Sequence, residues 1–163
     1  MKNRNGFTIM EMMVVIAITA IIMTIAIPNL VSWRNNQQFS RAVRQVFSDM
    51  QKARMSAISS NTFAFVQFDK DANTYVAWRD VPGGNPGALD PGTDVIIERG
   101  TMPPGVTIDS PLFSGTDTAS FSPMGLGRSV GGALRFGSVV VKSQDGRQRR
   151  VVMDTAGRIK IES

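Results

Sequence analysis

The sequence has no cysteine and no histidine, and aromatic residues make up only 7% of its 163 residues. Without cysteine the chain has no disulfide and no thiol nucleophile. Without histidine it lacks the commonest general base and nearly all zinc ligand sets. These absences argue against an enzyme, and we expect neither a cofactor nor a metal ion.

Positive charge is unevenly distributed along the chain, whose formal net charge is +5. Residues 34–60 carry five bases against one acid, residues 61–138 carry five bases against eight acids, and residues 139–163 carry six bases against three acids. The basic character therefore lies in the first third and at the C-terminus. The length and the apolar content of 42% predict one domain plus an anchor.

The longest apolar run extends from Phe7 to Ile27 and contains one charge. As a helix it is about 30 Å long, which matches the apolar thickness of a bilayer. Lys2 and Arg4 precede it, so the N-terminus is predicted to stay in the cytoplasm and the rest of the chain to lie outside. Because Ile25–Pro28 offers no small-residue cleavage pattern, we expect the span to be retained.

The one charge in this run is Glu11, whose burial in lipid without a partner costs a few kcal/mol. Two interpretations are open. Glu11 pairs with a cation of another subunit, or it belongs to a plain membrane anchor and reaches the bilayer surface.

The stretch Gly6-Phe7-Thr8-Ile9-Met10-Glu11 resembles the N-terminal signature of the type IV pilin and type II secretion pseudopilin superfamily. The resemblance extends to Pro28, at the family's usual mid-helix proline. It implies that prepilin peptidase cuts between Gly6 and Phe7 and that the new Phe7 amine is methylated. It also implies that Glu11 meets the N-terminus of a neighbouring subunit in a filament.

Beyond Pro28 the helix is predicted to continue with a kink, because proline removes a backbone donor. Apolar residues then recur at three- and four-residue spacing, which predicts one buried stripe on a globular head. Four bases lie largely off that stripe, and we expect them to face solvent or neighbouring subunits. The helix is predicted to end near Asn61. The stripe is Val43, Val46, Phe47, Met50, Ala53 and Ala57, and the bases are Arg41, Arg44, Lys52 and Arg54.

From Thr62 the pattern predicts β-structure, because aromatic and β-branched residues alternate between polar turns. A hairpin, two short strands, a weakly patterned stretch over 110–132 and a C-terminal antiparallel meander are expected in that order. The Pro- and Gly-rich stretch 81–92 is predicted to be a surface loop. The expected strands are 62–68, 75–79, 95–99, 106–108, 139–143, 149–153 and 158–161.

Two short motifs resemble ligand sites. Asp69, Asp71 and Asn73 match the first half of a calcium loop, but Thr74 stands where glycine is required and Asp80 where glutamate is required, so a plain polar turn is preferred. The stretch Gly125–Arg128 resembles a phosphate-binding loop but has no strand-then-helix context, so that interpretation is rejected.

The order of elements is similar to that of the FimT/FimU/GspH group of minor pilins and pseudopilins. The implied fold is α+β, with a long N-terminal helix packed on an antiparallel β-sandwich-like head. The predicted organisation is a cleaved leader over residues 1–6, a transmembrane and filament-core segment over 7–33, and a globular head over 34–163.

The turn in the C-terminal meander carries four residues of interest, Gly146, Arg147, Arg149 and Arg150. The first three match the Gly-Arg-x-Arg motif associated with DNA binding in FimT-like minor pilins. Guanidinium groups on an exposed hairpin suit phosphate contact, which without an aromatic in the turn would be non-specific and salt-sensitive. The alternative is that these arginines serve packing or solubility.

The sequence therefore favours a minor type IV pilin, anchored in the bacterial inner membrane with its head in the periplasm and then assembled into a pilus or at its tip. The alternative is an H-type pseudopilin of a type II secretion system. The expected partners are other pilin or pseudopilin subunits, the prepilin peptidase and methyltransferase, the membrane and, through the arginine turn, double-stranded DNA.

Overall fold

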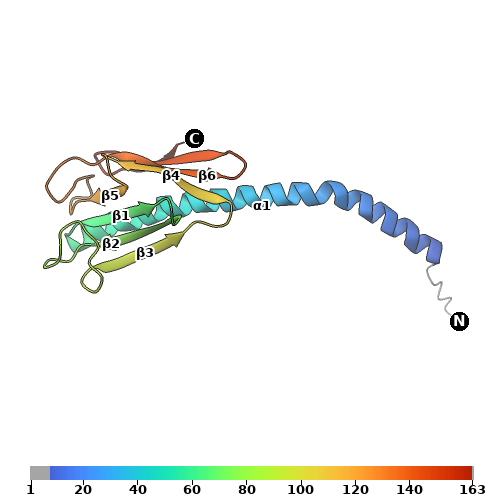
Figure 1. The fold of residues 1–163 in the computed structure, drawn as a ribbon, viewed down its shortest axis with the longest axis horizontal. Coiled ribbons are helices and arrows are strands. Elements are labelled where there is room, and N and C mark those ends of the chain that lie inside the picture. The colour runs from blue at the N-terminus through green and yellow to red at the C-terminus, as the bar shows by residue number, and fades with distance from the viewer. Residues whose placement is uncertain (1–7, 163) are drawn as a thin grey trace. The chain divides into compact units, whose positions relative to one another are not determined.

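A computed structural model describes residues 8–162. One long helix is followed by a series of short strands (Figure 1). The predicted order, helix first and strands after, is confirmed. The elements are α1 (Ile9–Ser60), β1 (Ala64–Asp69), β2 (Thr74–Arg79), β3 (Val95–Thr101), β4 (Val106–Phe113), β5 (Thr118–Phe121), β6 (Gly137–Ser143), β7 (Gln148–Met153) and β8 (Ile159–Glu162).

Helix α1 is 52 residues long and continues through Pro28. The chain divides into two compact units between Gln37 and Gln38, so the helix contributes to both. In the first unit every described helical residue is exposed, whereas the second unit contains the whole apolar core. The expected kink at Pro28 stays a prediction.

The helix ends at Ser60, and the next residue, Asn61, adopts a positive φ of 53°. The Asn61 N–H donates to the Ile58 carbonyl at 3.3 Å, and the Thr62 N–H donates to the Ala57 carbonyl at 3.2 Å. This pair of bonds is the Schellman arrangement, in which a left-handed residue satisfies the last helical carbonyls. Asparagine tolerates that conformation better than most residues do, so the predicted end at Asn61 has a local cause.

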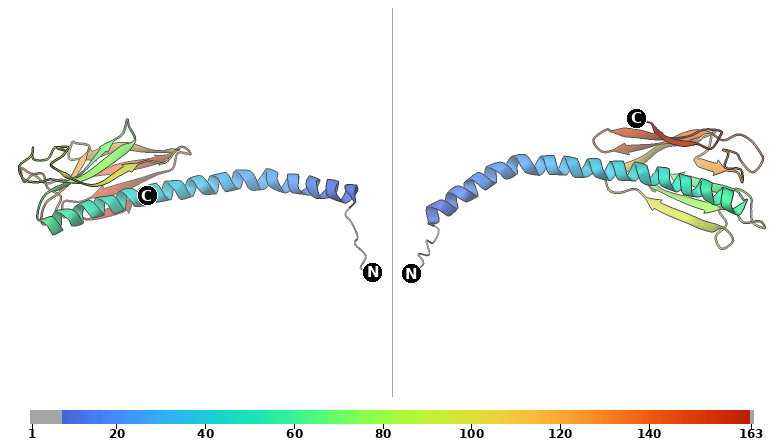
Figure 2. Two further views of the ribbon diagram at one scale, coloured as in Figure 1. Left: turned by 90° about the horizontal axis from the view of Figure 1, so that it is seen from below. Right: turned by 180° about the vertical axis from the view of Figure 1, so that it is seen from behind.

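The strands form two antiparallel four-stranded sheets in the head. Sheet A has the order β3-β2-β1-β5, and sheet B has the order β4-β6-β7-β8. In Figure 2 the green strands β1 and β2 of sheet A and the red strands β7 and β8 of sheet B lie in separate layers. The predicted hairpin is β1–β2 and the predicted meander is β6–β7–β8, and both are confirmed with the α+β class.

One apolar core joins the helix to both sheets. Val43, Val46, Met50, Ala53 and Ala57 on α1 are fully buried, which confirms most of the predicted stripe. They share the core with the inward faces of β1, β4, β6 and β7. Alternation of buried and exposed residues along these strands places one face of each sheet on the core.

Three of the four off-stripe bases, Lys52 among them, are exposed as expected, and one is not. Lys52 forms ion pairs with Asp49 and Glu98. Arg54 is half-buried, and its Nε donates to the Gly125 carbonyl at 2.9 Å. Arg54 therefore ties the helix to a loop of the head, whereas Arg41 and Arg44 are exposed.

Two strands are better formed than the sequence indicated. The expected strand 106–108 extends to Phe113, because a bulge after Asp109 places Pro111 where no ladder hydrogen bond is needed. The weakly patterned stretch contains β5, which pairs with β1 and buries Phe121 completely. The sequence did not predict this strand because the residues around Phe121 are mostly polar.

The predicted loop 81–92 contains neither helix nor strand, and the irregular stretch continues to residue 94. Beside it, on the face of sheet A away from the main core, Phe65 stacks on Trp78 with ring centroids 5.4 Å apart. Asp94 organises the loop, since its carboxylate accepts hydrogen bonds from the Val81 and Asp90 N–H groups at 3.0 and 2.8 Å. Sheet A thus has a small second apolar layer on its outer face.

Candidate assembly and binding sites

The first turn of α1 contains the candidate assembly residue Glu11. Thr8 precedes the helix, and its hydroxyl oxygen accepts a hydrogen bond from the Glu11 N–H at 3.2 Å. Thr8 is therefore an N-cap, and Glu11 occupies the third helical position, where the helix dipole favours a carboxylate. No cation among residues 8–162 pairs with Glu11. Gly6 and Phe7 lie outside the described residues.

Beyond the first turn of α1, the side chains of the apolar segment are also exposed. The helix contains an 18-residue window of mean hydropathy 2.5 with no residue buried, so it is long and apolar enough to cross a membrane. Two of the three threonine hydroxyls of the segment donate back to helical carbonyls, Thr19 to Val15 at 2.6 Å and Thr24 to Ala20 at 2.9 Å. Both are thereby satisfied without water, as an apolar environment requires.

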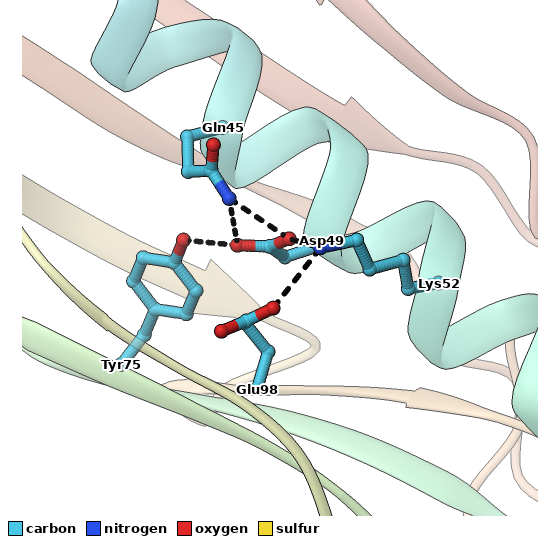
Figure 3. Close-up of polar contacts among 5 residues, drawn as sticks. All are labelled: Gln45, Asp49, Lys52, Tyr75 and Glu98. Carbon is cyan, nitrogen blue, oxygen red and sulfur yellow. Dashed lines mark hydrogen bonds and ion pairs between the residues drawn. The ribbon is translucent and has the colours of Figure 1, made fainter.

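A buried carboxylate joins the helix to sheet A (Figure 3). Asp49 is fully buried on the core side of α1. Its oxygens accept hydrogen bonds from the Tyr75 hydroxyl at 2.5 Å and from the Gln45 amide at 3.0 and 3.2 Å. Lys52 lies 2.8 Å from Asp49 and 3.0 Å from Glu98 of β3. Three donors thus compensate a charge that would otherwise be costly to bury.

The pKa shifts around this cluster agree with its geometry. Burial, and then the hydrogen bond to Asp49, raises the pKa of Tyr75 far above its usual value, so Tyr75 remains a donor at every physiological pH. The hydrogen bonds to Asp49 and Glu98 raise the pKa of Lys52. The cluster therefore fixes one position of α1 relative to β2 and β3.

Sequence reasoning missed the role of Asp49, although a signal was present. Asp49 lies three residues after Val46 and directly before Met50, both on the apolar stripe. A lone acid at a core position needs buried donors, and the sole tyrosine of the chain was a candidate.

The arginine turn is a short hairpin loop between β6 and β7. Only Gly146 adopts a positive φ, of 84°, and its N–H donates to the Ser143 carbonyl at 3.0 Å. Ser143 and Arg147 then close the hairpin through a 2.8 Å bond. The loop therefore has three residues, 144–146, with glycine at the left-handed position.

The Arg147 side chain contacts other residues of the head. Its Nε donates to the Asp145 carboxylate at 2.8 Å, and its guanidinium lies 5.8 Å from the centroid of the buried Phe39 ring. The Arg147 side chain lowers the pKa of Asp145 to about 2. These contacts hold the turn against α1, which is the packing role weighed above.

Arg149 of the motif and its neighbour Arg150 lie on opposite faces of β7. Arg149 is half-buried and shares its face with the buried Val151, whereas Arg150 is exposed on the outer face of sheet B. The structure therefore does not bring Arg147, Arg149 and Arg150 together on one surface.

The calcium-like turn uses its polar groups internally. Asp69 accepts hydrogen bonds from the Asp71 and Ala72 N–H groups at 2.9 and 2.8 Å. The Asn73 amide donates to the Val106 carbonyl at 2.8 Å and accepts from the Ile108 N–H at 2.7 Å, linking the turn to β4. Within residues 8–162 no three acidic side chains are grouped as a metal ion requires.

Comparisons with known proteins agree with this architecture. The sequence model of the family described as Type II transport protein GspH matches residues 42–157, which is most of the chain. The prokaryotic N-terminal methylation motif matches residues 1–27. No curated protein sequence matches the chain.

Two kinds of solved structure share the fold. The type IV minor pilin FimU of Pseudomonas aeruginosa is 18% identical, with a TM-score of 0.55 over 80% of this chain and 92% of that one. The minor pseudopilin EpsH from the Type 2 Secretion System of Vibrio cholerae is 13% identical, with a TM-score of 0.53 over 77% of this chain and 97% of that one.

Proposed function

We propose that the chain, which belongs to the family described as Type II transport protein GspH, is a minor pilin of a type IV pilus. In this proposal residues 1–6 are removed by prepilin peptidase, the Phe7 amine is methylated, and residues 7–33 hold the subunit in the bacterial inner membrane. The N-terminus faces the cytoplasm, and the head, residues 34–163, faces the periplasm until the subunit enters the pilus or its tip.

The position of Glu11 carries the proposal. Glu11 is the only acid of the uncovered apolar segment and lies in its first turn, four residues from the proposed new N-terminus. In lipid this carboxylate needs a cation, and the amine of an incoming subunit supplies one. Pairing of Glu11 with a neighbouring subunit during assembly explains why an acid is present in a segment that enters lipid. It also explains why the apolar helix is exposed in the single chain.

Removal of the Glu11 carboxylate tests the proposal. Glu11→Ala should leave membrane insertion intact or improve it, because an apolar residue is cheaper in lipid, while subunit incorporation into filaments falls at least about tenfold. The measurement is the amount of subunit in sheared, purified filaments relative to the membrane. Thr24→Ala, a polar deletion in the same helix, is the matched control. Normal incorporation of Glu11→Ala would contradict the pairing.

The second candidate is an H-type pseudopilin of a type II secretion system, which has the same fold. EpsH, a protein of that class, matches about as well as FimU. Pro28 favours the pilus, because pseudopilins of that type keep this proline less regularly. Deletion of the gene decides between the two: we expect loss of surface pili with secretion unchanged, and the reverse result would establish the pseudopilin.

DNA contact during uptake is a further proposal for the same subunit, and the exposure of Arg150 beside the Gly146-Arg147-x-Arg149 motif supports it. Arg147→Gln with Arg149→Gln should weaken binding of duplex DNA by the detergent-solubilised chain and flatten its salt dependence. Because Arg147 is held by Asp145, Arg150→Gln alone should have an effect of similar size. Equal binding by all variants would leave these arginines with packing roles.

A further inference from the structure

A basic groove lies at the end of the head where helix α1 enters it. The groove has a volume of about 440 Å³, and its lining includes Gln38 and Arg41 from α1 and Arg99 and Thr101 from β3. Both guanidinium groups are exposed, and neither forms a hydrogen bond or an ion pair with any residue from 8 to 162. Two arginines are therefore available to an anionic group from outside the chain.

The surface around the groove is also positively charged. Asp49 contributes to the lining, but its carboxylate is fully buried and pairs with Lys52 at 2.8 Å. Arg44, three residues beyond the first arginine of the groove, is exposed and has no partner in the described part of the chain. Residues 34–48 contain three arginines and no acid. We call the set Arg41, Arg44 and Arg99 the basic edge.

The β1–β2 turn, at the same end of the head, has the opposite charge. Thr74 of β2 pairs with Thr101 of β3, so this turn lies beside the end of β3. It carries Asp69 and Asp71 against Lys70, and none of these three side chains forms an ion pair within residues 8–162. This end of the head is thus basic along α1 and acidic at the turn, so an anionic surface attracts one side and repels the other.

The basic edge follows closely on the apolar segment of the chain. Trp33 is exposed at the end of that segment, and tryptophan is typical of the boundary between lipid and water. Both residues lie in one continuous helix, so Arg41 follows Trp33 by about 12 Å along it. The headgroup layer occupies about 5–7 Å of this distance, and the potential of a charged bilayer extends about 8–10 Å further. Arg41 therefore lies within the range of that potential.

We propose that, before assembly, the head docks on anionic phospholipid of the inner membrane through the basic edge, with the β1–β2 turn directed away from the bilayer. Guanidinium groups suit this contact because they stay charged and present several N–H donors to a phosphate. The proposal rests on the proposed function, since membrane anchoring keeps the edge beside lipid. Anchoring also raises the effective concentration of lipid, so a few charge contacts suffice.

Contact-range quenching in nanodiscs tests the docking. The full-length chain has no cysteine among its residues, so one fluorophore can be attached at Ser48→Cys, on the exposed surface of α1, or at Ala72→Cys, in the β1–β2 turn. The quencher is a nitroxide on the lipid headgroups. Replacing phosphatidylcholine by its equal mixture with phosphatidylglycerol should raise quenching at position 48 and leave position 72 nearly unchanged. High salt should reverse the rise, because exposed charges are screened.

Charge removal then identifies the arginines. Arg41→Gln with Arg99→Gln should lower the ratio of docked to free heads at least about fivefold in the anionic nanodiscs. Arg41→Lys with Arg99→Lys should retain most of the docking, because a lipid surface attracts either cation. Arg128→Gln with Arg150→Gln removes the same charge from exposed positions elsewhere in the head and is the matched control, which should dock normally.

Three results would each overturn the proposal: no effect of lipid charge on quenching, an equal rise at positions 48 and 72, or unchanged docking without Arg41 and Arg99. Binding of duplex DNA that requires these two arginines, with no effect of lipid charge, would assign the surface to nucleic acid instead.

Filament incorporation of the unlabelled chain, measured in cells, separates this inference from the proposed function. If the chain is incorporated but does not dock, the docking is wrong and the proposed function stands. If the chain docks but never enters filaments, the proposed function is wrong.

Discussion

At the scale of single residues, a glycine in β3 leaves room for the Asp49 cluster. Gly100 of β3 pairs in register with Tyr75 of β2, and a Cβ atom at position 100 would lie 2.0 Å from the Tyr75 ring. The tyrosine can therefore cross β3 to reach Asp49 only because residue 100 is glycine. The hydrogen bond between Tyr75 and Asp49 therefore depends on Gly100.

Gly100→Ala should destabilise the head by at least about 2 kcal/mol, because the methyl group displaces the Tyr75 ring and breaks its bond to buried Asp49. Tyr75→Phe, which removes the hydroxyl alone, should cost about 1.5–3 kcal/mol. Gly131→Ala is the control, since its nearest neighbour, Ser129 Oγ, is 4.0 Å away. Urea unfolding of the detergent-solubilised chain gives these free energies, and equal midpoints for Gly100→Ala and Gly131→Ala would refute the account.

Asp80 is a second residue whose surroundings predict a measurable effect. Burial, and then the Asp94 carboxylate, raises its pKa. The folded chain therefore holds this proton more tightly than the unfolded chain does, so the contribution of Asp80 to stability is complete below about pH 3.9 and is lost as the pH rises through the folded pKa. Nearby Asp90 acts in the same direction.

Asp80→Asn should accordingly raise the urea midpoint at pH 7, and the gain should shrink toward zero as the pH approaches 4. Asp71→Asn, at an exposed position of the β1–β2 turn, provides the comparison and should change the midpoint little at either pH. A gain for Asp80→Asn that is equal at both pH values would show that charge burial is not its cause.

At the scale of elements, periodicity predicted the structure well where one pattern dominated. The stripe from Val43 to Ala57 identified the packed face of α1, and the alternation over Val139–Val141 and Val151–Met153 identified the meander. Strand β5 was harder to predict because Thr118–Phe121 carries one large apolar residue in a polar stretch, and its pairing with β1 is a long-range contact that no local pattern shows.

The candidate sites were likewise predictable where the signal was local and not where it depended on a long-range contact. Glu11 was identifiable because a charge in an apolar run is a local anomaly. The Asp49–Tyr75 contact spans 26 positions and the cation–π contact of Arg147 with Phe39 joins the two ends of the head sequence, so neither could be read from spacing. The arginines of the turn were visible in the sequence, but the placement of Arg149 and Arg150 on different faces depends on where strand β7 begins and pairs.

The end of α1 gives a test at this scale. Asn61→Ala should lower the free energy of unfolding by about 1 kcal/mol, because alanine at a positive φ is strained, whereas Asn61→Gly should leave it nearly unchanged. Circular dichroism during urea unfolding of the full chain measures both. If alanine and glycine behave alike, the left-handed residue does not determine where the helix ends.

At the scale of the whole molecule, one helix serves two units of different chemistry. Residues 9–37 are exposed and mostly apolar, while residues from 38 onward contribute a buried stripe and the Asp49 cluster to a head with its own core. A subunit of this kind needs lipid or other helices around its first unit. The proposed function therefore requires that the apolar segment remain attached after processing.

The intact mass of the chain extracted from membranes tests this requirement most directly. The account predicts a protein that begins at Phe7 and carries one added methyl group, with residues 7–33 present. A chain that begins near residue 28 and is recovered free in the periplasm would contradict it.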